Sequence, residues 1–305
     1  MDAVVLAGGI PRPDEPLYSH SNGEAKALID VAGQPMIQWV LDALSEAESI
    51  ERVVVVGLSA KAQLRCARPI TYLSNQGKLL ENLKAGTARV LELNPAARHI
   101  LFVSSDIPGV TGEMVDWLVR TCAETDDDLY YNIIRRQDMD RRFPGSRRTW
   151  TRLKDMQVCG GDMNMVRAAV ISQHSGFWER VIEQRKNPLA QARLFGLDIS
   201  FKLLTRQLTA DEVIRRVAQR LGLKGRAIVC PYPEIGMDVD KPNQLDLMRA
   251  DLARRVRRLA VAEKPRRTTR SARKVPAARK TSAAKKAASK PAGRTARKAP
   301  ARPKR

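Results

Sequence analysis

The chain has 305 residues, 43% of them hydrophobic, which is enough apolar material for one large domain or two modest ones. Its net charge of +21 is unevenly spread, because residues 264–305 hold 17 Lys or Arg and no Asp or Glu, and the rest carries +4. It has no run of about 18 apolar residues, which argues against a membrane-spanning helix. With the lack of a secretory signal pattern, this predicts a cytoplasmic protein without a membrane partner.

The first strand and the turn after it organise the rest of the chain. Residues 3–6 are aliphatic and lead to Gly8 and Gly9, which is typical of a buried strand in a parallel sheet. Glycines at the carboxyl end of a strand let the backbone pass close to a ligand, because no Cβ stands in the way. Ligands of open α/β sheets bind at these carboxyl ends, so we expect a ligand beside the two glycines.

The chain then alternates between helices and strands. After a polar loop and Lys26, amphipathic helices are expected at residues 36–44, at 79–90 and from Thr111, which is an N-cap residue. Further strands are expected at residues 52–57, 70–73 and 99–106. This alternation predicts a doubly wound, mostly parallel α/β sheet of the Rossmann-like type.

The second half of the chain contains a long helical stretch between two further strand regions. Strands are expected at residues 129–134, 158–166 and 227–230, with an arginine-rich polar segment at 135–154 and a last helix opened by residues 236–242. Thr209 begins a capping box, and Gly222 is expected at the C′ position of the same helix. Because this stretch is long for a connection, it predicts a small helical lid, about residues 175–225, packed over one side of the sheet.

The carboxyl end differs from everything before it. Residues 264–305 are almost all Lys, Arg, Ala, Pro, Ser and Thr, so they have little to bury and repel one another. We therefore expect one domain at residues 1–263, followed by a disordered tail. The tail resembles those of linker-histone-like bacterial proteins, and its charge would bind DNA or RNA with little sequence preference. One hypothesis is accordingly a nucleic-acid-associated protein with a non-catalytic nucleotide-binding domain.

The other hypothesis comes from a resemblance in the first forty residues. Leu6-Ala7-Gly8-Gly9, then Lys26 followed by Ala-Leu-Ile, then Val-Ala-Gly-Gln-Pro-Met-Ile resembles the opening of the MobA-like NTP transferases, which are nucleotidyltransferases of the GT-A type. Two positions depart from the family pattern, because Ile10-Pro11-Arg12 replaces the usual third glycine and Ala25 stands where proline is usual. The resemblance implies transfer of an NMP group from an NTP, with CTP or GTP favoured, to a small phosphorylated or hydroxyl acceptor, releasing pyrophosphate.

The resemblance also implies a magnesium site at the carboxyl ends of the strands. Asp106, in Asp-Ile-Pro, matches the metal-binding Asp-x-Pro motif of the family, and Asp238 and Asp240 match its second carboxylate motif. Mg²⁺ prefers hard oxygen ligands, usually one or two carboxylates together with substrate phosphates. One of Asp238 and Asp240 can cap the last helix while the other faces the metal, and the sequence leaves open which.

Other residues are candidates for holding the two substrates. Lys26 and Arg12 are the expected phosphate clamps and, with Asp106, the expected catalytic residues, because fixed cations stabilise charge on the transferring phosphate. The expected nucleotide-binding residues are Leu6, Ala7, Gly8, Gly9, Lys26, Asn75 and Gly77, and the expected acceptor-binding residues are Gly160, Gly161 and Asp162. A simple turn is the alternative interpretation for both glycine-containing loops.

The cysteines and histidines suggest no further chemistry. Cys66, Cys122, Cys159 and Cys230 lack the spacing of a zinc site, so free thiols in a reducing compartment are expected. The three histidines are interpreted as structural or surface residues.

Overall fold

The computed structural model describes residues 1–173, 197–220 and 222–262. The chain divides into two units, Met1–Glu263 and Lys264–Arg305, and all the described residues belong to the first. The predicted disorder of the tail and the first part of the predicted lid lie outside the described residues. Within these residues, no helix combines the length and apolar character needed to cross a membrane.

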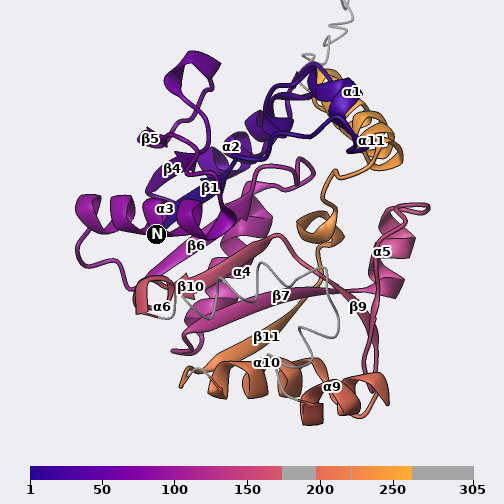
Figure 1. Cartoon of the computed structure of the whole chain (residues 1–305). Helices are drawn as coiled ribbons and strands as arrows, with labels where there is room; N and C mark the ends of the chain where they lie inside the picture. Colours follow the sequence, from indigo (N-terminus) through magenta and orange to yellow (C-terminus); the bar gives the residue numbers. More distant parts are fainter. Residues whose placement is uncertain (174–196, 221, 263–305) are drawn as a thin grey trace, which may run out of the picture. The chain divides into compact units, whose positions relative to one another are not determined.

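A single mixed sheet forms the centre of the first unit (Figure 1). One half is parallel, in the order β5-β4-β1-β6. These strands are β1 (Asp2–Leu6), β4 (Arg52–Val56), β5 (Ile70–Leu73) and β6 (His99–Ser104). All four match the predicted strands. Their central residues in β1, β4 and β6 are aliphatic or aromatic and buried, as expected for strands covered on both faces.

The other half of the sheet reverses direction at β10. This strand lies antiparallel between β6 and β7, and β11 adds to β7 in parallel. The elements here are β7 (Leu129–Arg135), β8 (Thr151–Arg152), β9 (Gln157–Gly160), β10 (Met163–Arg167) and β11 (Gly225–Cys230). Residues 158–166 were expected to hold a turn and one strand; the turn is present at Gly160–Asp162, and it joins parts of two strands because the chain turns back along the sheet there.

Helices cover both faces of the parallel half, which confirms the doubly wound prediction. Helix α2 (Met36–Glu46) and α4 (Gly112–Ala123) pack with Ala3 and Val5 of β1 on one face. Helix α3 (Leu79–Leu93) and α6 (Ala168–Gln173) pack with Val4 on the other face of the sheet. Successive side chains of a strand point to opposite faces, so one aliphatic run serves both layers.

The remaining elements lie beside this core. The arginine-rich segment forms a helix that the sequence did not predict, α5 (Arg136–Arg142), and the last helix is α11 (Pro242–Ala262). Shorter elements are α1 (Tyr18–Ser21), η1 (Lys26–Leu28), β2 (Asp30–Val31), β3 (Gln34–Pro35), η2 (Ala60–Ala62) and η3 (Pro233–Gly236). Helix α11 packs into the main core through Leu245, Met248 and Leu252.

The described part of the helical stretch packs on the sheet near β7, β9 and β11. Helix α9 (Leu197–Leu204) and α10 (Ala210–Gln219) belong here, and Ala210 joins Ile133 and Val158 in a small apolar cluster. The Thr209 capping box is present, and Gly222 has the expected positive φ of 69°. That these helices act as a lid stays a prediction.

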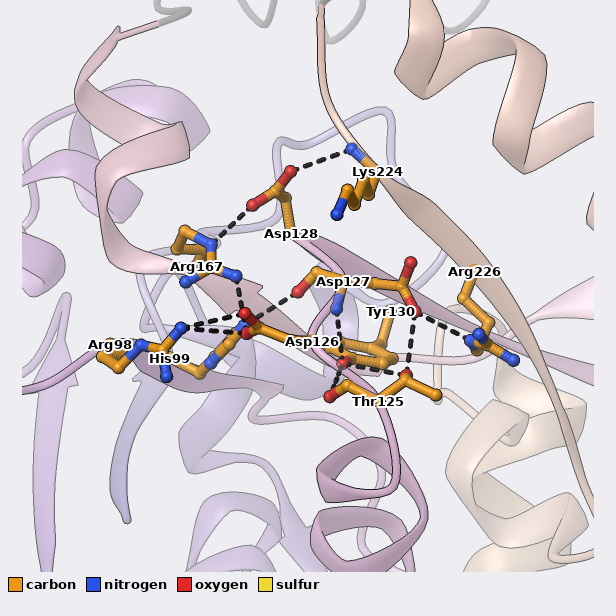
Figure 2. A network of polar contacts seen from close by, with 10 residues as sticks. All are labelled: Arg98, His99, Thr125, Asp126, Asp127, Asp128, Tyr130, Arg167, Lys224 and Arg226. Carbon is orange, nitrogen blue, oxygen red and sulfur yellow. Dashed lines mark hydrogen bonds and ion pairs between the residues drawn. The ribbon is translucent and has the colours of Figure 1, made fainter.

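A polar network, here called the amino-edge network, joins the starts of β6, β7 and β11 to the end of β10 (Figure 2). Asp126, Asp127 and Asp128 lie at its centre. Arg167 donates to both Asp126 and Asp128, at 2.8 and 2.5 Å. Further members are Arg98, His99, Thr125, Tyr130, Lys224 and Arg226.

Candidate functional site

The strand register places the predicted site residues at the opposite edge of the sheet. Leu6, the last residue of β1, pairs with Ser104 at the end of β6, so Gly8 and Asp106 follow neighbouring strand ends. Asp162 lies at the same edge, since the next residue, Met163, pairs with Val103 of β6. The carboxyl ends of β1 and β6 and the start of antiparallel β10 therefore meet.

Backbone hydrogen bonds bring the 238–240 segment to this edge. The Val239 amide donates to the Asp106 carbonyl at 3.0 Å, and the Asp162 amide donates to the Ile235 carbonyl at 2.8 Å. These bonds join three segments that are far apart in the chain. Six charged residues gather there, here called the crevice cluster: Lys26, Asp106, Arg148, Asp162, Asp238 and Asp240.

Lys26 lies between two carboxylates of the crevice cluster. Its Nζ is 2.5 Å from Asp106 Oδ2 and also forms an ion pair with Asp240. Its backbone amide donates to the Gly9 carbonyl at 2.9 Å, so the lysine is fixed to the glycine turn. Burial lowers the pKa of Lys26, but the charges of Asp106 and Asp240 outweigh it and raise the pKa above its ordinary value. Lys26 is therefore a permanent cation here.

Asp162, in contrast to Lys26, lies near charges of its own sign. Burial, and then the nearby Asp106 and Asp240 carboxylates, raise its pKa to about 7, although Arg148 and Lys26 act against this. Its Oδ2 is 3.9 Å from Arg148 and receives no hydrogen bond from the described residues. The sequence assigned Asp162 to the acceptor side, and the structure brings it into the same cluster as Asp106. The cluster holds more carboxylates than cations.

Arg148 is a site residue that the sequence analysis missed. Its side chain is 12% exposed and forms an ion pair with Asp238, whose side chain is 14% exposed. It also lies near the Cys159 thiol, whose pKa is raised by burial and lowered in part by this arginine. Arg148 belongs to a segment with several other arginines, and nothing in its local sequence distinguishes it.

The structure also separates Asp238 from Asp240. Asp240 shares Lys26 with Asp106, whereas Asp238 is paired with Arg148. Each of these carboxylates thus forms an ion pair within the crevice cluster. Among the described residues, neither accepts a capping hydrogen bond from a backbone amide of α11, so the prediction that one of them caps this helix gains no support.

The glycine turn is packed closely against a loop that contains two asparagines. A Cβ on Gly8 would lie 2.8 Å from side-chain atoms of both Asn75 and Asn82, and Asn75 Nδ2 donates to the Gly8 carbonyl at 2.7 Å. Gly57, with φ of 110°, also lies against the Gly8 backbone. The close approach that the sequence predicts at Gly8 is present, but the atoms that approach Gly8 belong to the protein itself. Asn82, which donates to Asn75 Oδ1 at 3.1 Å, was not identified from the sequence.

The other predicted nucleotide-binding residues are at or near this turn. Leu6, the last residue of β1, is partly buried, and Ala7, which follows it, is buried. A Cβ on Gly9 would meet no atom within 4 Å, so this glycine faces open space. Gly77 has a positive φ of 85°, and its amide donates to Asn75 Oδ1 at 3.0 Å. Nucleotide contact by these residues stays a prediction.

Packing against neighbouring side chains explains the two glycines of the predicted acceptor-binding turn. A Cβ on Gly160 would collide with the Tyr131 hydroxyl, and one on Gly161 would lie 2.9 Å from Asn132 Cβ, so packing alone requires these glycines.

Arg12 has an exposed side chain and is paired with Asp14 at 3.9 Å and Glu15 at 3.5 Å. The structure does not bring Arg12 into contact with Lys26 or Asp106, and its role as a phosphate clamp stays a prediction.

The Lys26 ammonium shows where a cation fits in the crevice cluster. Asp106 and Asp240 both reach it, so their oxygens converge on one positive charge. The described residues contain no group of three or more His, Cys, Asp or Glu spaced to hold a metal ion. Two carboxylates together with substrate phosphates are nevertheless a usual arrangement for Mg²⁺. The residues present therefore fit magnesium that arrives with a phosphate ligand.

Comparison with solved structures defines the class of fold. A hypothetical transferase from Thermus thermophilus is 34% identical, with a TM-score of 0.70 over 80% of this chain and 98% of that one. A CMP:2-keto-3-deoxy-manno-octonic acid synthetase complexed with CTP is 15% identical, with a TM-score of 0.54 over 83% of this chain and 99% of that one. This second likeness concerns the fold alone.

Sequence comparison then gives the family. Residues 3–180, more than half of the chain, match the MobA-like NTP transferase domain, and the chain belongs to this family. A probable molybdenum cofactor guanylyltransferase of Pyrococcus horikoshii is 28% identical over 118 residues, which is 39% of this chain and 54% of that protein. The chain thus spans about half the length of this curated relative. The resemblance found in the first forty residues is confirmed.

Proposed function

We propose that this protein is a magnesium-dependent nucleotidyltransferase, which transfers an NMP group from an NTP to a small phosphorylated or hydroxyl acceptor. The observation that carries the proposal is the position of Lys26 between Asp106 and Asp240, at the edge where β1 and β6 end. Ligands of open α/β sheets bind at that edge. Family membership supports the same activity.

The glycine turn and two cations would hold the triphosphate. The Gly8–Gly9 turn leaves room for it, because Gly9 faces open space. Lys26 stays charged, so it can leave its two carboxylates and stabilise the negative charge that builds up on the α-phosphate and the leaving pyrophosphate. Arg12 is close enough in sequence to the glycine turn to add a second cation if its loop folds over the phosphates.

Asp106 and Asp240 would hold Mg²⁺ in this proposal. When bound, the ion would neutralise phosphate charge and orient the triphosphate for in-line attack. Asp162, which lies in the same cluster as Asp106, is the proposed acceptor of the proton from an acceptor hydroxyl. It follows directly on Gly160 and Gly161, which were assigned to the acceptor side.

The preferred NTP is proposed from the relatives. The name of the Pyrococcus horikoshii relative specifies a guanylyltransferase, and the synthetase of similar fold was solved with CTP. We therefore favour GTP or CTP. Asn75 and Gly77 are the proposed contacts to base and sugar, since an amide side chain suits the edge of a base.

Calorimetric titration tests the proposal. GTP, CTP, ATP and UTP are titrated into the full chain with Mg²⁺ and again in EDTA. We expect one NTP to bind more tightly than the others with Mg²⁺ and only weakly in EDTA, because the crevice carboxylates repel a bare triphosphate. Equal affinity in EDTA contradicts the metal assignment, and no binding by any NTP contradicts the function.

A further inference from the structure

Arg148 and Asp238 form a buried ion pair beside the proposed magnesium site. Both side chains are almost equally shielded from water, at 12% and 14% exposed. The residues on either side of Asp238, Met237 and Val239, are fully buried. Taking a carboxylate out of water is costly unless a cation accompanies it, so Arg148 is what allows Asp238 to lie there.

The segment that carries Arg148 is fastened to the start of α11. Lys241 Nζ donates to the Arg147 carbonyl at 3.5 Å and Asn243 Nδ2 to the Gly145 carbonyl at 3.2 Å. Gln244, which is 1% exposed, donates to the Ser146 carbonyl at 3.2 Å and accepts from the Asp240 amide at 2.9 Å. One buried glutamine therefore links the backbone of the Arg148 segment to that of Asp240.

The two aspartates face different cations although only Val239 separates them. Asp238 meets Arg148, and Asp240 meets Lys26 together with Asp106. An Asp238 carboxylate without Arg148 would be a buried, uncompensated charge within reach of the same crevice. It would draw in water or compete with Asp240 for Lys26, and either change would move the 238–240 segment.

We propose that Arg148 is a positioning residue that neutralises Asp238, so that Asp240, and not Asp238, is presented with Asp106 to the cation and the triphosphate. Arg148 itself does not touch the nucleotide. The inference rests on the proposed function for the identity of the ligand. It goes further by assigning one of the two aspartates to the ligand and the other to the protein's own arginine.

A double-mutant cycle tests this proposal. The variants are Arg148→Met, Asp238→Asn and the combination of both, and Arg147→Met is the matched control. Arg147 is the adjacent residue in the same loop and is exposed. The binding of Mg²⁺ with GTP and with CTP is measured by calorimetry below the melting temperature of every variant. Should Arg148→Met fail to fold, Arg148→Gln takes its place in the cycle, because it also removes the charge.

We expect Arg148→Met to weaken binding about tenfold or more and Arg147→Met to change it less than about twofold. The combined variant should bind more tightly than Arg148→Met alone, because asparagine leaves no uncompensated charge at position 238. If the combined variant binds as weakly as Arg148→Met, the arginine contacts the nucleotide and the proposal is overturned. Unchanged binding in Arg148→Met overturns it as well.

Crystal structures of the free variants separate this proposal from the proposed function. The Lys26 ion pair with Asp240 should be lost or displaced in Arg148→Met and present again in the combined variant, whether or not any nucleotide binds. An intact ion pair in Arg148→Met would disprove positioning by Arg148. If the wild-type chain binds no NTP while the ion pair behaves as expected, the proposed function fails and the positioning role stands.

Discussion

The two edges of the sheet compensate their carboxylates to different extents. In the amino-edge network, the side chains of Asp126, Asp127 and Asp128 are each paired with arginine, and Lys224 adds a backbone amide. In the crevice cluster, four carboxylates face two cations, Lys26 and Arg148. The amino edge is compensated by the protein itself, whereas the crevice keeps an excess of negative charge.

The pKa shifts follow this division at Asp162 but not at Asp240, where burial acts to raise the pKa and the charge and hydrogen bond of Lys26 lower it below its ordinary value. In the amino-edge network, Arg167 lowers the pKa of Asp126, and Arg226 and Thr125 lower that of Asp127 although burial acts to raise it. In the crevice, burial and neighbouring carboxylates raise the pKa of Asp162 to about 7. A carboxylate that already has its counter-charges serves the fold. One that still needs a cation or a proton marks a place where a ligand can bind.

The largest expected effect comes from removing a carboxylate of the crevice. Replacing Asp106 by Ala should lower the rate of pyrophosphate release by about a thousandfold, because the proposed metal and Lys26 both depend on it. Pyrophosphate is measured with a coupled assay, and circular dichroism checks the fold. Asp140→Ala, at a side chain 51% exposed on α5, is the control and should be unaffected. Near-normal turnover in Asp106→Ala would falsify the proposed role.

Removing a cation from the amino-edge network should instead affect stability. Arg167→Met removes the arginine that pairs with Asp128, whose side chain is 19% exposed, and we expect it to lower the free energy of unfolding by about 2 kcal/mol. Arg98→Met, at a side chain 68% exposed, should lower it by less, because water screens this pair. Urea denaturation gives both values. A loss of nucleotide affinity in folded Arg167→Met would contradict the division between the two edges.

Acid should weaken the amino-edge network in a predictable direction. The folded protein lowers the pKa of Asp127, so this group stabilises the fold above its ordinary pKa of about 3.9, and the contribution disappears as the pH falls through the lowered value. Arg226→Met removes a cause of the lowering and should make stability less dependent on pH in this window. Thermal melts of both proteins between neutral and acidic pH measure it. Equal slopes would show that the ion pair does not contribute.

The smallest effect on folding is expected from removing the second unit. A chain ending at Glu263 should keep its cooperative melting, because residues 264–305 have few apolar side chains to add to a core. It should, however, lose most non-specific affinity for duplex DNA. In the full chain that affinity should fall steeply with salt, since 17 cations would release counterions. Fluorescence anisotropy with both chains decides this, and equal DNA binding would place the basic surface on the first unit.

The sequence determined the features that depend on near neighbours. The aliphatic run before Gly8, the β-branched run of β4, and the Thr209 capping box each combine residues within a few positions of one another, and each was found where predicted. Asp106 could be proposed as a site residue for the same reason, because a strand and an Ile-Pro turn flank it and match the Asp-x-Pro motif of the family. Alternating burial along a strand and amphipathic spacing along a helix leave a direct record in the order of residues.

Only the tertiary structure decided which charges meet. Lys26 reaches Asp106 and Asp240 across 80 and 214 positions of sequence, and no local pattern encodes such a pairing. The proposed role of Arg148 depends on side chains at and just before the start of α11, which donate to the backbone of its segment, so the sequence could not distinguish it from neighbouring arginines. The division between Asp238 and Asp240 has the same origin. Coulomb interactions depend on distance in space, which the fold alone determines.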